Sequence, residues 1–132
     1  MPSELYPCPC CGYFMFPESP GSFDICNICV WQDCHVQLTC PFDDSGPNRT
    51  SLYDSQRNFL RNGPSEERLR RSECRLADFT LDPTWRPFDP AKDAYLRWDV
   101  PEDRELVPNY SFDGGRYYWR DDYWLRSKGS KA

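Results

Sequence analysis

Basic residues are missing from the first third of this 132-residue sequence. Residues 1–48 hold six acidic side chains and not one Lys or Arg. Because Lys and Arg contacts to phosphate dominate the affinity of proteins for nucleic acid, we do not expect this third to bind DNA or RNA. Seven Arg and four acids follow in residues 49–76, and residues 77–132 are again weakly acidic, so the net charge is −5.

Long apolar runs are also missing. No stretch approaches the roughly 20 apolar residues that are needed to cross a bilayer. The N-terminus MPSELYPCPC has neither the basic start nor the apolar centre of a signal peptide. We therefore expect a cytoplasmic protein without membrane contact, in which the eight cysteines are thiols or metal ligands rather than disulfides.

Catalytic patterns are equally scarce. The sequence has a single histidine, His35, and it contains neither a glycine-rich phosphate loop nor a serine flanked as in a nucleophile elbow. The adjacent Cys34 cannot easily align with His35 as nucleophile and base. We therefore interpret the protein as non-enzymatic.

Proline, aromatic rings and cysteine are what the sequence does have. Thirteen prolines interrupt the chain too often for long helices and favour short strands and turns. Aromatic residues make up 16% of the chain, so the core depends on a few large rings. The length suits one domain, residues 1–132, and we predict a small α+β fold.

Four of the cysteines form two CxxC pairs, Cys8 with Cys11 and Cys26 with Cys29, separated by fourteen residues. Gly12 follows the first pair and permits the positive φ at which the chain can reverse. Two such turns, called knuckles below, can place four thiolates around one ion with no open position, which is the pattern of structural zinc. We predict a zinc ribbon of short antiparallel strands over residues 1–45, with one Zn²⁺ per chain.

Two alternatives stay open at this cluster. Paired CxxC knuckles also fit a rubredoxin-like iron site, unmetallated thiols or disulfides, although zinc is preferred. Cys10 can replace Cys11 as ligand in a frame shifted by one residue. We favour Cys11, because it keeps the CxxC spacing with a glycine directly after it.

A second metal site is disfavoured. Its candidate ligands Cys34, His35 and Cys40 have irregular spacing, and they need the distant Cys74 as a fourth ligand. The simpler interpretation is that these side chains fill space or lie at the surface.

Residues 46–76 are predicted to be helical. Thr50 or Ser51 is a suitable N-cap, and Gly63 with the following proline ends the first helix at about residue 62. Its expected apolar face contains Leu52, Gln56, Phe59 and Leu60, with Tyr53 beside it. Ser65 begins a possible second helix through about residue 75. Around the knuckles, β-prone pieces predict strands at residues 13–16, 23–25 and 30–31.

Residues 77–126 form a proline- and aspartate-rich, aromatic extension, followed by an expected flexible tail at 127–132. A short helix is expected around residues 91–98. Glycines at 114 and 115 between aromatic arms predict a β-hairpin, with arms at Tyr110 and Phe112 and at Tyr117 and Trp119. These rings, with Tyr118, Tyr123 and Trp124, are expected to build core, although an exposed recognition patch is the alternative.

The segments CPCCGY, PESPGSFDIC and CNICVW, with VQL and GPN after them, resemble the bacterial cysteine-rich CPCC family of small zinc-ribbon-like proteins. The resemblance covers about residues 6–62, including the helix SLYDSQRNFLRNG. It implies the same four ligands, Cys8, Cys11, Cys26 and Cys29, and a buried Trp31 beside the second knuckle. It implies a fold more than a function.

Three functions compete at this point. The first is a protein-interaction module, such as an immunity protein or antitoxin that docks an acidic surface onto a basic toxin, for example a nuclease. The second is a nucleic-acid-binding or regulatory protein that uses the arginines of residues 49–76, but the acidic ribbon and the neighbouring glutamates make nucleic acid an improbable partner. The third is a redox or metal sensor acting through Cys10, Cys34, Cys40 and Cys74.

Overall fold

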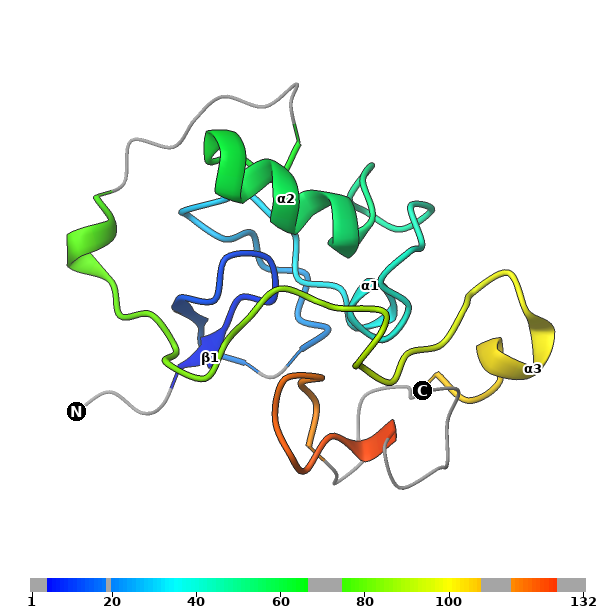
Figure 1. Ribbon diagram of the computed structural model, residues 1–132. Helices are drawn as coiled ribbons and strands as arrows, with labels where there is room; N and C mark the ends of the chain where they lie inside the picture. The colour runs from blue at the N-terminus through cyan, green and yellow to red at the C-terminus, as the bar shows by residue number, and fades with distance from the viewer. Residues whose placement is uncertain (1–4, 19, 67–74, 108–114, 126–132) are drawn as a thin grey trace.

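The described structure, a computed structural model, comprises residues 5–18, 20–66, 75–107 and 115–125. Along the chain it contains β1 (Tyr6–Pro7), β2 (Phe14–Phe16), α1 (His35–Thr39), α2 (Leu52–Asn62), a 3-10 helix η1 (Leu76–Asp78) and α3 (Pro101–Arg104). Figure 1 shows the segment from η1 to α3 crossing the molecule between α2 and the orange C-terminal segment. The small α+β class is confirmed for these residues.

The two strands form one antiparallel sheet. Tyr6 lies opposite Phe16 and Pro7 opposite Phe14, with an irregular register between the two pairs. Residues 80–82 lie along the other edge of β2, where Phe14 N–H donates to the Thr80 carbonyl at 2.8 Å. A segment that follows α2 in the sequence therefore extends the edge of the N-terminal sheet.

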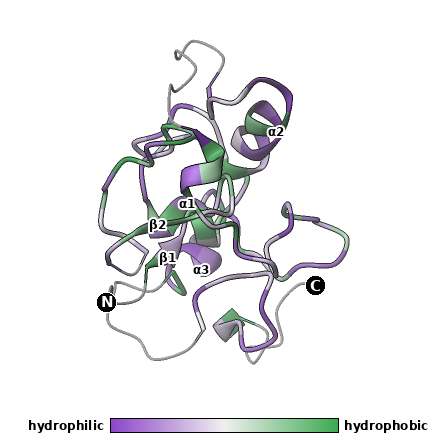
Figure 2. Cartoon of the chain, turned by 90° about the vertical axis from the view of Figure 1, so that its left-hand side faces the viewer, coloured by the Kyte–Doolittle hydropathy of each residue, from purple (hydrophilic) through white to green (hydrophobic). Residues whose placement is uncertain are grey.

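The first predicted helix is confirmed as α2. The Ser51 hydroxyl accepts from Asp54 N–H at 3.1 Å, and Gly63 ends the helix at φ 108°, a conformation that glycine adopts without strain. Figure 2 shows hydrophilic and hydrophobic stretches alternating along this helix. The predicted apolar face is partly wrong, since Leu52 and Gln56 are buried but Leu60 is exposed.

Several smaller predictions fail or fall outside the described residues. Residues 23–25 and 30–31 are not strands; an isolated antiparallel bridge joins Ile25 to Gln32, which lies just beyond the second piece. Residues 91–98 are turn and loop rather than helix; Asp89 and Asp93 fold residues 89–93 into a tight turn, and residues 94–97 continue as loop. Most of the second helix of residues 65–75 and the flexible tail lie outside the described residues.

The predicted C-terminal hairpin is not confirmed. Its first arm and its turn up to residue 114 lie outside the described residues, and residues 116–122 of the other arm are loop and turn. Gly115 instead forms an isolated parallel bridge with Tyr123. The expectation that the C-terminal rings build core is confirmed for Tyr117, Tyr118, Trp119 and Tyr123, which are all buried.

Phe88 lies at the centre of the aromatic core. Its ring makes edge-on contacts at 5.4–5.8 Å between centroids with three other rings, those of Phe42, Tyr95 and Tyr118. Edge-to-face pairs of this kind add roughly 0.5–1.5 kcal/mol each beyond the area they bury. The extension therefore packs on the part of the chain that contains the cysteines through rings drawn from residues 42–118.

Within the described residues, no helix has the length and apolar character that a membrane span requires.

Candidate metal centre

Four buried thiols meet at one point in the N-terminal segment. The sulfur atoms of Cys8, Cys11, Cys26 and Cys29 all lie within 4.8 Å of one another. Cys8 Sγ is 3.6 Å from Cys29 Sγ, and Cys11 Sγ is 3.8 Å from Cys26 Sγ. None of the four side chains is more than 1% exposed. Each close pair joins one knuckle to the other, so the cluster holds the two knuckles face to face.

These distances fit a single metal ion. A tetrahedral zinc site with Zn–S bonds of about 2.3 Å has S···S edges of about 3.8 Å. The two close pairs match that edge. A disulfide requires about 2.05 Å between the sulfurs, which neither pair approaches. The four cysteines can therefore hold one metal ion, and they would supply all four donors.

The two knuckles have the same local backbone. In the first, Gly12 N–H donates to the Cys8 carbonyl at 2.7 Å, and Cys8 N–H donates to the Tyr13 carbonyl at 2.9 Å. In the second, Val30 N–H donates to the Cys26 carbonyl at 3.0 Å, and Cys26 N–H donates to the Trp31 carbonyl at 2.8 Å. Each CxxC turn is thus closed by the two residues that follow it.

The carbonyl of Pro9 connects the first knuckle to the rest of the protein. It accepts hydrogen bonds from Gln56 Nε2 of α2 at 3.0 Å and from Trp85 Nε1 of the extension at 2.9 Å. The Trp85 ring also lies over Gly12, where a Cβ atom would come within 2.6 Å of it. A glycine is therefore needed at residue 12 both for its φ of 84° and for the room it leaves.

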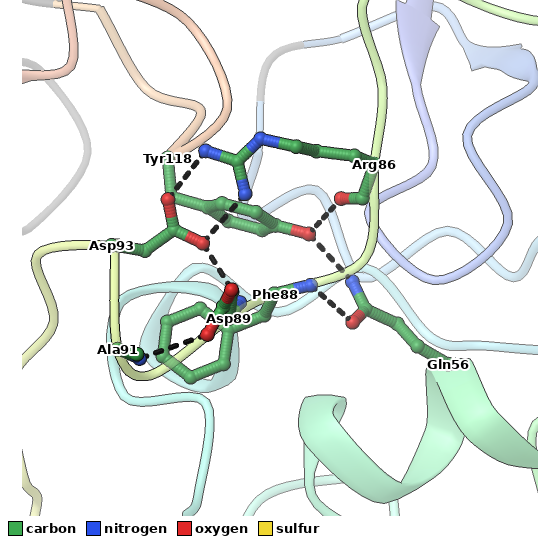
Figure 3. Close-up of polar contacts among 7 residues, drawn as sticks. All are labelled: Gln56, Arg86, Phe88, Asp89, Ala91, Asp93 and Tyr118. Atoms are coloured by element: carbon green, nitrogen blue, oxygen red, sulfur yellow. Dashed lines mark hydrogen bonds and ion pairs between the residues drawn. The ribbon is translucent and has the colours of Figure 1, made fainter.

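Gln56 extends this connection into the C-terminal part of the chain (Figure 3). Its Nε2 also donates to the Tyr118 hydroxyl at 2.8 Å, and its Oε1 accepts from Phe88 N–H at 2.8 Å. Tyr118 in turn donates to the Arg86 carbonyl. One buried amide side chain therefore links the metal knuckle, α2 and two segments of the extension.

Arg86 and Asp93 hold the loop around Phe88 in place. The guanidinium of Arg86 makes two hydrogen bonds to the buried carboxylate of Asp93, at 2.6 and 2.8 Å (Figure 3). Asp89 N–H donates to the same carboxylate at 2.8 Å. A bidentate pair of this kind is geometrically specific, so the loop presents Phe88 to Gln56 in one orientation.

Burial and neighbouring thiols shift the pKa of three of the four cysteines. Desolvation raises the pKa of Cys8 and of Cys29, because a charged thiolate is unfavourable in the interior. Hydrogen bonds from Cys11, and further ones from Cys29 and Cys8, instead lower the pKa of Cys26. Without a cation, burial therefore favours neutral thiols at Cys8 and Cys29, and a bound cation would be needed to hold these two as thiolates.

Cys10 lies outside the group of four sulfurs, although it precedes Cys11. It is fully buried, and its thiol donates to the Ser55 carbonyl of α2 at 3.4 Å. Burial raises the pKa of this thiol. Cys10 therefore acts as a neutral contact between the first knuckle and α2.

The structure does not bring the candidate ligands of a second site together. Cys34 and Cys40 flank the two ends of α1, and burial raises the pKa of both, that of Cys40 to about 12. Among the described residues, the group of His, Cys, Asp and Glu side chains close enough to hold a metal is the four-cysteine cluster. Cys74 lies outside the described residues.

The sequence profile of the family described as Cysteine-rich CPCC matches residues 6–78, which is more than half of the chain. The chain belongs to the Cysteine-rich CPCC family. The match extends beyond the helix α2 and covers both knuckles of this CPCC protein. No curated protein and no solved structure matches the chain significantly.

Trp31 has the position that the family resemblance implies. It is fully buried, and it lies two residues after the second knuckle, whose Cys26 N–H donates to the Trp31 carbonyl. The contributions of Gln56 and Trp85 have no comparable sequence signal. Both act through hydrogen bonds to residues far away in the chain, and Trp85 lies outside the matched segment of this CPCC protein.

Proposed function

We propose that this CPCC protein is a non-enzymatic, zinc-stabilised protein-interaction module. The observation that carries the proposal is the closed set of four buried thiols, all within 4.8 Å of one another. A catalytic zinc site keeps a position for water or substrate, whereas four protein sulfurs leave none. Zinc bound here would supply folding free energy rather than Lewis-acid chemistry.

Zinc is proposed over iron for two reasons. Four thiolates in a tetrahedral arrangement suit both metals, but zinc has no redox chemistry and contributes stability at any redox potential. The neighbouring Cys10 is also buried against α2 with a raised pKa, so the thiol next to the site is not arranged as a reactive thiolate. A structural ion is therefore the simpler assignment.

A protein partner is proposed because of the charge distribution. Residues 1–48 contain six acids and no Lys or Arg, so this third favours a basic partner and repels nucleic acid. Arg57, in the middle of α2, already interacts within its own helix. Its Cζ lies 3.6 Å from the centre of the Tyr53 ring, and its guanidinium donates to the Tyr53 carbonyl. An immunity protein or antitoxin that blocks a basic toxin fits this pattern.

The metal assignment is tested on the purified full chain. Elemental analysis by mass spectrometry is expected to find about one zinc per chain. The Cys26→Ser variant is expected to lose both the zinc and the cooperative melting transition, because the site contributes roughly 10 kcal/mol or more in apparent terms. Iron at one per chain would change the identity of the metal but keep the site. The absence of any stoichiometric metal would overturn the proposal.

The partner assignment is tested by reconstitution. The products of the genes on either side of the coding sequence are purified, and their binding to the zinc-loaded chain is measured by calorimetry at about 0.05 and 0.5 M salt. A basic partner whose affinity weakens as salt rises is expected. Gel shifts with random DNA and RNA serve as the contrast, and salt-dependent binding there without a protein partner would reverse the assignment.

A further inference from the structure

Two apolar side chains project into solvent from the arm that leads into the second knuckle. Phe23 is 53% exposed and Ile25 is 56% exposed, and the acidic side chain of Asp24 lies between them and is exposed too. Single exposed apolar residues are normal on protein surfaces. Two such residues on one short arm, directly before the buried candidate ligand Cys26, indicate a surface with a function.

The arm is held rigidly by residues 32 and 33. Phe23 N–H donates to the Asp33 carbonyl at 2.9 Å, and Asp33 N–H donates to the Asp24 carbonyl at 2.8 Å. Gln32 Nε2 donates to the Phe23 carbonyl at 3.1 Å. The Asp33 carboxylate also accepts from the backbone N–H and hydroxyl of Ser22, at 3.1 and 2.8 Å.

Phe23 has an uncommon backbone conformation. Its φ is 66°, in the left-handed region that bulky side chains rarely occupy. A buried ring would explain the strain as the cost of packing, but the Phe23 ring is more than half exposed. The strained backbone at residue 23 therefore presents an aromatic ring to solvent. Strained residues are concentrated at sites that bind a ligand or partner.

The surroundings of the pair indicate the chemistry of the partner. Asp24 lies within the pair, Glu18 is exposed on the same segment, and no basic residue occurs before Arg49. Interface hot spots are commonly aromatic anchors at the centre of a contact with a polar rim around them, and a preformed arm lowers the entropy cost of binding. Acidic surroundings exclude a second copy of this equally acidic segment and favour a basic surface.

We propose that Phe23 and Ile25 are the anchors by which the chain docks into an apolar depression with a basic rim on a partner protein. This inference rests on the proposed interaction function and adds the surface that performs it. The metal centre then has a specific task, because it fixes Cys26 and with it the C-terminal end of the arm. Asp24 and Glu18 face the basic rim and give the binding its salt dependence.

The test places a photoreactive side chain on the arm in the full-length, zinc-loaded protein. p-Benzoylphenylalanine replaces Phe23 in the cells that normally make the protein, and the cross-linked product is identified by mass spectrometry. The same side chain at Leu106 is the control, because Leu106 is 46% exposed and lies next to α3, outside the family match. The captured protein is purified, and its affinity for the unmodified chain is compared with that for the F23A/I25A and L106A variants.

The proposal predicts one dominant basic protein captured at position 23 and not at 106. F23A/I25A is expected to bind it about tenfold more weakly or worse, while L106A binds as wild type and all three proteins carry equal metal. A partner that binds F23A/I25A undiminished, or that is captured at 106 alone, overturns this surface but leaves the interaction function standing. Capture of no specific protein at either position overturns both.

Discussion

Gly12 and Val30 occupy equivalent positions in the two halves of the metal centre. Each directly follows the second cysteine of its knuckle, each donates its N–H to the carbonyl of the first cysteine, and their φ angles are 84° and 69°. One half therefore uses the residue that suits a left-handed conformation, and the other uses a β-branched residue that does not. The difference is explained by Trp85, which needs the space above Gly12.

Exchanging these two residue types gives unequal results. Gly12→Val is expected to lower the free energy of unfolding by about 3 kcal/mol, because it adds both left-handed strain and a clash with Trp85. Val30→Gly is expected to change it by less than about 1 kcal/mol, since relief of strain offsets the flexibility of glycine and the loss of a half-buried side chain. Urea unfolding at fixed free zinc measures both, and equal losses would contradict the role given to Trp85.

Neighbouring cysteines give a matched pair for the ligand set. Cys11→Ser is expected to reduce bound zinc from about one per chain to nearly none after dialysis, because it removes one of four thiolates. Cys10→Ser is expected to keep the zinc, since a serine hydroxyl can replace the thiol that donates to Ser55. A colorimetric zinc assay on both variants decides between them. If Cys10→Ser lost its zinc and Cys11→Ser kept it, Cys10 rather than Cys11 would be the ligand.

Gln56 offers a test of the link between the metal knuckle and the extension. Gln56→Leu is expected to cost about 2–4 kcal/mol of stability, because it leaves the buried N–H of Phe88 without an acceptor and removes a donor from Pro9. The control Leu60→Ala, on the exposed side of the same helix, should stay within about 0.5 kcal/mol of wild type. Calorimetric melting of zinc-loaded protein measures both, and a neutral Gln56→Leu would show that the two parts fold without this contact.

Local patterns allowed the metal cluster and the main helix to be predicted from the sequence. A CxxC turn encodes the approach of its two sulfurs within four residues, and Ser51 and Gly63 delimit α2 through contacts to their immediate neighbours. The pairing of the two knuckles followed from the donor chemistry, because one ion needs four ligands. The predicted strands at residues 23–25 and 30–31 are absent because Phe23 and Val30 have positive φ angles. Neither residue type indicates such a conformation in the sequence.

The buried face of α2 was misjudged for a related reason. Apolar periodicity placed Leu60 inside, but Leu60 is exposed and the buried side chains include Gln56 and Asn58, which donate to the carbonyls of Pro9 and Ser65. Gln56 contacts Phe88 and Tyr118, which are 32 and 62 positions away. Polar residues become core when distant carbonyl and amide groups need partners, and those partners are defined by the tertiary fold alone.

Asp33 predicts how stability depends on pH. Burial, opposed by hydrogen bonds from Ser22, raises the pKa of its carboxyl from 3.8 to about 6. The folded protein therefore binds a proton that the unfolded chain releases between about pH 4 and 6, so this residue adds stability at low pH and loses that contribution as pH rises through 6. Asp33→Asn removes the effect while an amide oxygen can still accept from Ser22.

The difference in stability between wild type and Asp33→Asn should therefore change by about 1 kcal/mol between pH 5 and 7, with wild type relatively more stable at pH 5. Both proteins are unfolded by urea at saturating zinc, so that protonation of the thiolates affects both equally and cancels in the difference. Asp24→Asn is the control, because Asp24 is exposed next to the same turn. A difference that stays constant with pH would mean that Asp33 is ionised throughout this range, and that the arm carrying Phe23 is held by a carboxylate in full charge.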